Sequence, residues 1–251
     1  MIREETVFGP IHSRRLGSSL GINLLPRHGK ICNFDCIYCE CGWNKDGRDD
    51  RQLPTAAQVR SALEDKLAQC LLDGTRIDSI TFSGDGEPTL NPEFPRIIDD
   101  TLKLRDAYFP SAKVSVLSNA TRVHIPEIAA ALRRVDNPIL KIDAPTDGLV
   151  GRINHPAPGY SLERVLEALR GFGGDFVLQT MFLRSPDFDS AAPEVLDGWM
   201  KIVRDLRPRK IMVYTIDRPT PQEGLQKFTP AEMRALVQPL LDEGFNIDIK
   251  G

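Results

Sequence analysis

The sequence predicts an α/β fold in which helices cover a parallel sheet that curls into a partial TIM barrel, (β/α)6. From about residue 53 onward, strand-like and helix-like hydrophobic patterns alternate to the end of the chain. No linker, low-complexity tract or sequence repeat interrupts them, so residues 1–251 are expected to form a single domain. A doubly wound open sheet has the same periodicity and remains the alternative architecture.

The first strand–helix units are recognised from apolar periodicity and from helix caps. An initial strand is expected at residues 20–25. The first helix should begin at Thr55, because Thr55 and Gln58 have the spacing of a capping box, and it should end near Gly74. The apolar pattern then switches between the strand period and the helix period. The expected elements are strands at 79–82, 113–117 and 139–142 and helices at 92–107 and 126–135.

The second half of the chain continues the same alternation. Ser161 can cap a helix whose apolar residues extend to Leu169, and the apolar run 176–183 suits a strand buried on both faces. Thr229 and Glu232 again have capping-box spacing and mark the start of the last helix. The remaining elements are a helix at 194–206 and strands at 211–214 and 246–249. With the initial strand, the chain offers six strand–helix repeats.

Charge and hydropathy argue against a membrane segment and against a general polyanion-binding surface. The formal net charge is -3 and the pI is about 5.9, so no global positive field attracts nucleic acid. The longest apolar runs are far shorter than the roughly 18–20 residues needed to cross a bilayer. The N-terminal sequence MIREETVFGP lacks the apolar core of a signal peptide. A cytoplasmic protein without a membrane partner is therefore expected.

Four of the five cysteines lie between Cys32 and Cys41, which indicates a metal site rather than a disulfide scaffold. Cys32, Cys36 and Cys39 form a C-x3-C-x2-C pattern in the loop at about 30–42. Three thiolates at this spacing can hold three irons of a [4Fe–4S] cluster and leave the fourth iron open to another ligand. One alternative is a zinc-stabilised binding protein in which Cys41 closes a tetrahedral site, and another is a cluster with four cysteine ligands.

Polar residues follow several of the predicted strands. In a parallel barrel the C-terminal ends of the strands form the active-site mouth, so these residues are candidates for ligand binding. Residues 83–88, with the sequence Ser-Gly-Asp-Gly-Glu-Pro, follow one strand, and Ser118 and Asn119 follow the next. Lys141 and Asp143 close a further strand. A buried charge needs a partner, so Lys141 and Asp143 are expected either to pair with each other or to meet a ligand.

The cysteine loop resembles the radical S-adenosylmethionine (radical SAM) superfamily, whose signature is C-x3-C-x-aromatic-C with Tyr38 at the aromatic position. The resemblance implies that Cys32, Cys36 and Cys39 bind a [4Fe–4S] cluster whose open iron is chelated by S-adenosylmethionine. It places Tyr38 near the adenine and leaves Cys41 as a bystander. It further implies a flavodoxin or ferredoxin-type reductant and cleavage of S-adenosylmethionine to a 5′-deoxyadenosyl radical, which abstracts a hydrogen from an unidentified substrate.

The segment from Gly84 to Pro88 resembles the Gly-Gly-Glu-Pro element of the superfamily, which binds the methionine amino group of S-adenosylmethionine. Asp85 departs from that pattern because it separates the two glycines. The resemblance therefore assigns Gly84, Gly86 and Glu87 to the cofactor site, with Gly86 and Glu87 as the best matches.

Further cofactor contacts are expected at the ends of the next strands. Ser118 and Asn119 resemble the short polar residues that the superfamily uses for the ribose or carboxylate of S-adenosylmethionine. Asp143 is assigned to the same cofactor site as a strand-end carboxylate. No catalytic side chain is assigned beyond these binding residues.

The N-terminal stretch GPIHSRRLG, from Gly9 to Gly17, resembles one branch of the superfamily. Its members are iron–sulfur oxidoreductases related to the tRNA wyosine synthase. The branch makes a tRNA base a candidate substrate, beside a small molecule or a peptide. His12, Arg14 and Arg15 are candidate contacts to the substrate or to a phosphate.

Overall fold

The computed structural model describes residues 5–13, 17–46 and 50–251. The chain forms two compact units. The first unit comprises Met1–Cys32, Asn44–Ser118 and Ile125–Pro138, and the second comprises Asn33–Trp43, Asn119–His124 and Ile139–Gly251. The assignment of residues 1–251 to one domain stays a prediction. Arg14 and Arg15 lie outside the described residues.

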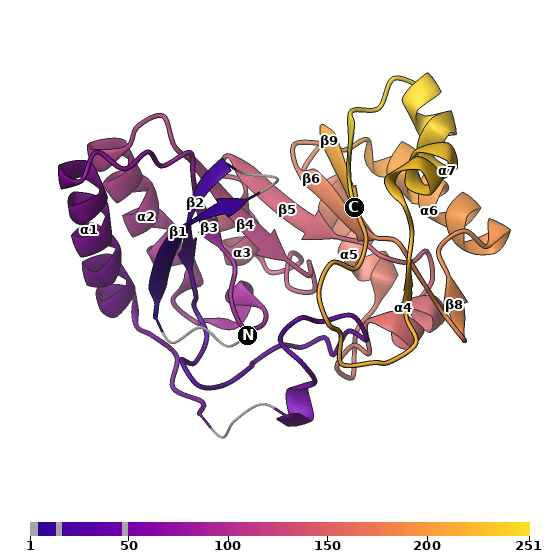
Figure 1. The fold of residues 1–251 in the computed structure, drawn as a ribbon, viewed down its shortest axis with the longest axis horizontal. Helices are drawn as coiled ribbons and strands as arrows, with labels where there is room; N and C mark the ends of the chain where they lie inside the picture. The colour runs from indigo at the N-terminus through magenta and orange to yellow at the C-terminus, as the bar shows by residue number, and fades with distance from the viewer. Residues whose placement is uncertain (1–4, 14–16, 47–49) are drawn as a thin grey trace. The chain divides into compact units, whose positions relative to one another are not determined.

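The described residues of the first unit form strands with helices packed against them (Figure 1). The strands are β1 (Val7–Ser13), β2 (Gly17–Ile22), β3 (Ser79–Phe82) and β4 (Lys113–Ser118). β1 pairs antiparallel with β2, whereas β2, β3 and β4 pair in parallel. The helices are α1 (Ala56–Leu72), α2 (Phe94–Tyr108) and α3 (Pro126–Leu132), with single turns at η1 (Asn44–Asp46) and η2 (Pro88–Leu90). α1 packs on α2 and α2 on α3.

The second unit repeats the parallel strand–helix arrangement. β5 (Asn137–Lys141) enters it from the first unit, and β6 (Val177–Met181), β9 (Lys210–Tyr214) and β11 (Ile247–Lys250) pair in parallel in that order. The helices are α4 (Asp147–Ile153), α5 (Leu162–Arg170), α6 (Pro193–Leu206) and α7 (Pro230–Asp242). A small antiparallel sheet contains β7 (Leu183–Ser185), β8 (Phe188–Asp189) and β10 (Gln226–Lys227).

Helix boundaries follow the caps that the sequence predicts. The Thr55 side chain accepts a hydrogen bond from the backbone N–H of Gln58, whose side chain accepts one from the Thr55 N–H, so α1 begins with a capping box. Thr229 and Glu232 form the same motif at α7. The buried face of α1 includes Cys70, so this cysteine is a small core residue.

The structure differs from the prediction at β1 and at the apolar run 176–183. The sequence pattern predicts no strand at β1; the strand lies at the edge of its sheet, where Pro10 is tolerated, with a register irregularity between Phe8 and Ile11. The apolar run is two strands, β6 and β7, because Phe182 donates its N–H to Tyr214 O and the following residues pair with β10.

Asp136 gives the first unit a testable pH dependence. Its Oδ2 accepts from the Val114 N–H at 2.9 Å and from Arg105 Nη1 at 2.7 Å, and Lys113 lies 3.2 Å from Oδ1. Partial burial alone would raise the pKa of this carboxyl, but these donors outweigh it and hold the pKa below its ordinary value.

We expect Asp136→Asn to lower the free energy of unfolding by about 1–3 kcal/mol at pH 7. A depressed folded-state pKa stabilises the protein above the unfolded pKa, near 4, and this contribution is lost as the pH falls through the folded value. Urea denaturation at pH 7 and at pH 3 should therefore show a gap between wild type and variant that narrows in acid. A gap of equal size at both pH values would contradict the assignment.

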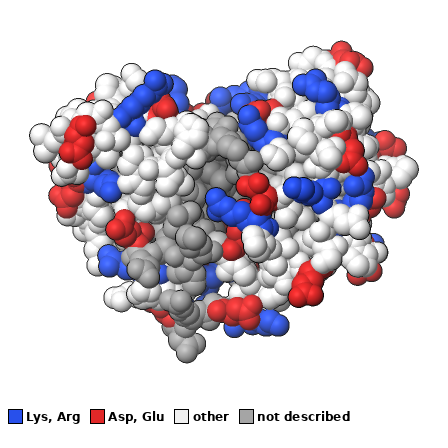
Figure 2. Space-filling model, in the orientation of Figure 1, with Lys and Arg blue, Asp and Glu red and all other residues white. Residues whose placement is uncertain are grey.

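The surface carries both signs of charge. Figure 2 shows Lys and Arg side chains interspersed with Asp and Glu on the face drawn, in keeping with the net charge of -3. Among the described residues, no helix has the length and apolar content needed to cross a membrane.

Candidate functional site

The loop after β3 is hydrogen-bonded to the residue that precedes Cys32. Ile31 donates its N–H to Asp85 O at 3.1 Å and accepts from the Glu87 N–H at 3.1 Å, so Ile31 and Gly86 form a parallel bridge. Gly86 has a φ of +136°, and a Cβ there would lie 1.9 Å from the Ile31 carbonyl oxygen. Only glycine allows this close approach of the strand-end loop to the cysteine loop.

Gly84 and Asp85 also have structural partners. A Cβ on Gly84 would lie 2.0 Å from Asn23 Oδ1, and the Asp85 N–H donates to that same oxygen at 3.3 Å. Asn23 Oδ1 accepts a further bond from the Leu25 N–H at 3.1 Å. Asp85, the departure from the superfamily pattern, is therefore a buried anchor of the loop.

Glu87 is held in a fixed position in the first unit. Its side chain is 2% exposed, and its Oε1 accepts from Ser118 Oγ at 2.9 Å, from the Thr89 N–H at 3.0 Å and from Thr89 Oγ1 at 2.6 Å. The structure thus brings together Glu87 and Ser118, two of the predicted site residues, at the C-terminal ends of β3 and β4. Burial of this carboxylate is compensated by its donors.

In the second unit the structure brings together Tyr38 and Asp143. Asp143 Oδ2 accepts from the Tyr38 hydroxyl and from Asn154 Nδ2, the latter at 2.8 Å, while Oδ1 accepts from the Met181 N–H at 2.9 Å. Asp143, which accepts from all three donors, is only 4% exposed. Burial, and next the charge of Asp143, raise the pKa of Tyr38 well above its ordinary value, so its hydroxyl keeps its proton.

Lys141 does not pair with Asp143. Within the described part of the chain it makes no ion pair; its Nζ lies 3.1 Å from the Tyr38 hydroxyl and 5.0 Å from the centre of that ring. Burial alone would lower the pKa of Lys141, but Tyr214 and Asp143 outweigh it and raise the pKa well above its ordinary value. The sequence left two outcomes open, and the described residues show no ion pair between Lys141 and Asp143.

Cys36 lies at the end of this hydrogen-bonded chain. Its sulfur is buried and lies 3.3 Å from Asn154 Nδ2. Burial raises the pKa of the thiol, and the charge of Lys141 and the bond from Asn154 act in the opposite direction. Sequence reasoning missed Asn154, which lies 118 residues from Cys36.

The cysteines have the chemistry of a cluster site. The described cysteines form no disulfide, and four of them are closely spaced in the sequence of the loop at about 30–42, which suits an iron–sulfur cluster or zinc. Cys32 belongs to the first unit, and Cys36 and Cys39 to the second. Among the described residues, the structure groups no three Cys, His, Asp or Glu side chains into a metal site. Ligation of a cluster by Cys32, Cys36 and Cys39 therefore stays a prediction. The chemistry of the three thiols fits such a cluster.

The connection between α4 and α5 supports the cysteine loop. Asp35 donates its N–H to Asn154 O at 2.8 Å, Ile37 donates to Ile153 O at 3.0 Å, and Ala157 donates to Asn33 O at 2.8 Å. Aromatic contacts extend this support: Trp43 stacks on His155, and Phe34 meets the edge of Tyr160. The backbone on both sides of Cys36 is thereby fixed.

Asn119 contacts the same loop from the end of β4. Its Nδ2 donates to Asn33 Oδ1 at 2.7 Å, and its Oδ1 accepts from Thr121 Oγ1 at 2.7 Å. Asn33 Nδ2 in turn donates to Thr121 Oγ1 at 2.6 Å. The three side chains form a small hydrogen-bonded network that holds Asn33, which lies between Cys32 and Cys36.

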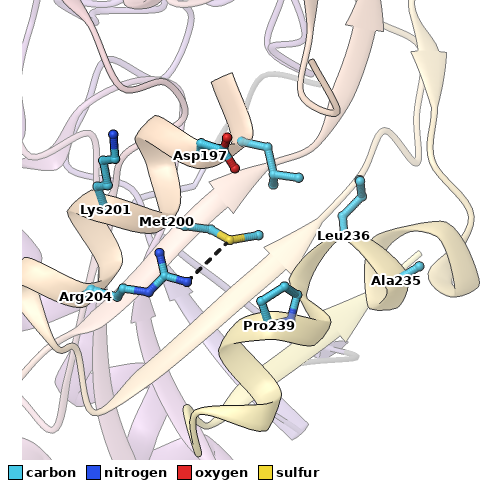
Figure 3. A pocket seen from close by; sticks show the side chains of 8 residues that line it. Asp197, Met200, Lys201, Arg204, Ala235, Leu236 and Pro239 are labelled. Atoms are coloured by element: carbon cyan, nitrogen blue, oxygen red, sulfur yellow. Dashed lines mark hydrogen bonds between the residues drawn. The ribbon is translucent and has the colours of Figure 1, made fainter. Parts of the chain in front are cut away.

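A separate surface pocket lies between α6 and α7 (Figure 3). Met200 and Arg204 project into it from α6 and face Leu236 and Pro239 of α7. Arg204 contacts the Met200 sulfur at 4.0 Å and pairs with Glu243 at 2.7 Å. None of the predicted site residues lines this pocket.

Comparison with known proteins identifies the relatives of this chain. Residues 27–183 match the radical SAM superfamily. A UPF0026 protein from Synechocystis sp. is 31% identical over 230 residues, which cover 88% of this chain and 78% of that protein. A protein from Brachyspira hyodysenteriae named GTPase Obg is 29% identical over 236 residues, which cover 92% of this chain but only 33% of that protein.

Solved structures show the same fold. A radical SAM methyltransferase from Sphaerobacter thermophilus superposes with a TM-score of 0.69 at 16% identity and covers 92% of this chain and 65% of its own. TYW1 with a lysine–pyruvate adduct bound has a TM-score of 0.63 at 14% identity, and the match covers 92% of this chain and 76% of that chain. The predicted α/β fold, a partial TIM barrel with helices outside a parallel sheet, is confirmed.

Proposed function

Because the chain belongs to the radical SAM superfamily, we propose that it is an enzyme that binds a [4Fe–4S] cluster through Cys32, Cys36 and Cys39 and uses S-adenosylmethionine. The cluster and S-adenosylmethionine together supply a 5′-deoxyadenosyl radical that abstracts a hydrogen atom from the substrate. The chain's own residues bind and orient these groups and exclude water from them.

One observation carries the proposal: the strand-end loop with Glu87 is hydrogen-bonded on both sides to Ile31, the residue before Cys32. The first cluster cysteine and the carboxylate expected to bind the methionine amino group therefore belong to one bonded element. Ser118 and Thr89 direct Glu87 Oε1, so this carboxylate is oriented before any ligand binds. Preorganisation of this kind lowers the cost of ordering the cofactor.

Residues of the second unit have complementary proposed roles. Tyr38 packs near the adenine, with its hydroxyl held by Asp143. Asn119 orders the segment between Cys32 and Cys36 through Asn33. Lys141 presents a charged ammonium group whose single hydrogen-bond partner among the described residues is the Tyr38 hydroxyl, and we assign it to an anionic group of the bound ligands.

The proposed partners are a flavodoxin or ferredoxin-type reductant and a substrate that is a small molecule, a peptide or a tRNA base. The resemblance of the stretch from Gly9 to Gly17 to the branch related to the tRNA wyosine synthase favours testing tRNA first. Nucleoside profiles of tRNA from a deletion strain should then lack one modified base. An unchanged profile would direct the search to small molecules and peptides.

Glu87→Gln tests the proposed amino-group contact. Glutamine keeps an Oε1 that can accept from Ser118 and Thr89, so the fold is expected to persist, but the negative charge is lost. We expect the dissociation constant for S-adenosylmethionine to rise about 10- to 100-fold, the range for a hydrogen bond to a charged group. Anaerobic equilibrium dialysis measures it.

The matched control is Glu93→Gln. Glu93 is close to Glu87 in the sequence, and its Oε2 lies 3.8 Å from Nη1 of Arg96 on the surface. This variant should bind S-adenosylmethionine as the wild type does. Equal affinity in Glu87→Gln and wild type would remove Glu87 from the cofactor site.

A further inference from the structure

We propose that Asn154 is a positioning residue that donates a hydrogen bond to the Cys36 sulfur and raises the reduction potential of the cluster bound there. The inference rests on the proposed function, because it concerns an iron–sulfur cluster. Asn154 Nδ2 lies 3.3 Å from Cys36 Sγ, and the side chain is 1% exposed. This residue belongs to none of the superfamily motifs described above.

The orientation of the Asn154 amide is fixed by its other partner. Asp143 Oδ2 lies 2.8 Å from Nδ2 and receives the Tyr38 hydroxyl as well, while Oδ1 receives the Met181 N–H. A carboxylate oxygen has no hydrogen to donate, so Asp143 Oδ2 must face the amide nitrogen of Asn154 and not its carbonyl oxygen. The nitrogen, with its two hydrogens, is therefore the atom that faces Cys36.

The two amide hydrogens have three acceptors within reach. The shortest contact, to Asp143, takes one hydrogen, and the second is shared between the Tyr38 hydroxyl at 3.1 Å and Cys36 Sγ at 3.3 Å. The Tyr38 oxygen already accepts from Lys141 Nζ. When Cys36 binds iron as a thiolate, its charge makes it the stronger acceptor for the second hydrogen.

The backbone holds this contact in place. Asp35 and Ile37, the two neighbours of Cys36, donate their N–H groups to Asn154 O and Ile153 O at 2.8 and 3.0 Å. These bonds hold the Asn154 backbone beside Cys36, and the bond to Asp143 Oδ2 holds the side-chain amide. A donor fixed in this way needs little reorganisation when the cluster gains an electron.

Hydrogen bonds to the sulfurs are among the determinants of iron–sulfur reduction potentials. The reduced cluster carries one more negative charge than the oxidised cluster, so a donor to its cysteine sulfur stabilises the reduced state more. Loss of the Asn154 donor should therefore make the midpoint potential more negative.

The experiment compares wild type with Asn154→Leu and Asn33→Leu after anaerobic iron–sulfur reconstitution. Asn33 is the matched control, because its amide also anchors the cysteine loop, through Thr121 and Asn119, without a hydrogen bond to a described sulfur. Redox titration followed by electron paramagnetic resonance, without S-adenosylmethionine, gives each midpoint potential. Iron content is measured alongside.

We expect Asn154→Leu to reduce the ratio of reduced to oxidised cluster at a fixed potential by roughly threefold to tenfold. Tenfold corresponds to about 59 mV for a one-electron couple. Asn33→Leu should keep the wild-type potential even if it holds less iron. Equal shifts in both variants, or no shift in Asn154→Leu, would overturn the inference while leaving the proposed function intact.

A second measurement covers the case in which Asn154→Leu fails to retain iron. Hyperfine spectroscopy of the reduced wild-type cluster, in protein labelled with ¹⁵N in asparagine side chains, should detect a coupled nitrogen that persists in Asn33→Leu. Absence of that coupling overturns the inference. A wild-type protein that binds no iron overturns this inference and the proposed function together.

Discussion

Cys32→Ala, Cys36→Ala and Cys39→Ala should each abolish the brown colour and the formation of 5′-deoxyadenosine from S-adenosylmethionine after anaerobic reconstitution with dithionite. Removal of one thiolate from a three-cysteine set leaves an iron without its protein ligand, so the loss should be complete and not graded. Iron and sulfide analysis and product chromatography measure the two effects.

Cys41→Ala and Cys70→Ala are the matched controls. Cys41 lies just beyond the signature, and Cys70 lies in the buried face of α1, so both variants should retain iron and cleavage activity. Iron lost in Cys41→Ala as well would indicate a cluster with four cysteine ligands. An iron-free wild-type protein with one equivalent of zinc, lost on mutation of Cys41, would replace the enzyme with a zinc-stabilised binding protein.

The elements that the sequence predicted well are those whose signals are local. The capping boxes at Thr55 and Thr229 involve residues three apart, so the helix starts could be located without tertiary information. α4 was missed because only Val150 and Ile153 of its seven residues are buried and two glycines interrupt it, so no apolar periodicity develops. The strand break at Phe182 depends on pairing with distant segments, which an uninterrupted apolar run does not reveal.

The residues of the candidate site also fall into those that a local sequence motif reveals and those that only the fold reveals. Tyr38, Gly86 and Glu87 could be assigned because each belongs to a short contiguous motif. Asn154 lies 118 residues from Cys36 and is followed by His155 and Pro156, which indicate only a turn. Its contact with the sulfur is created by the fold, so only the structure could identify it.

Asp85 shows why a motif departure need not weaken an assignment. The sequence suggested an inserted residue that separates two glycines, whereas the structure uses its backbone to join Asn23 and Ile31 to the loop. Asp85 therefore takes part in the link between the strand-end loop and the cysteine loop. This link also identifies the glycine substitution with the largest expected effect.

Gly86→Ala should destabilise the protein by about 3 kcal/mol or more and abolish 5′-deoxyadenosine formation. Two costs add: a φ of +136° strains any residue with a Cβ, and that Cβ would lie 1.9 Å from the Ile31 carbonyl oxygen. Relief requires the loop to move away from Ile31, which separates Glu87 from the residue preceding Cys32. Urea denaturation and cluster content measure the two consequences.

Two other glycines separate strain from crowding. Gly74 has a φ of +65°, and a Cβ there would have nothing within 4 Å, so Gly74→Ala should cost about 1 kcal/mol from strain alone and leave activity unchanged. Gly148 lies within α4, also in open space, and Gly148→Ala should be neutral or slightly stabilising. If Gly86→Ala resembled Gly74→Ala, the bridge to Ile31 would not be required for the site. If Gly86→Ala instead costs much more than Gly74→Ala and also loses iron, the additional loss of stability is due to the contact between the strand-end loop and the cysteine loop.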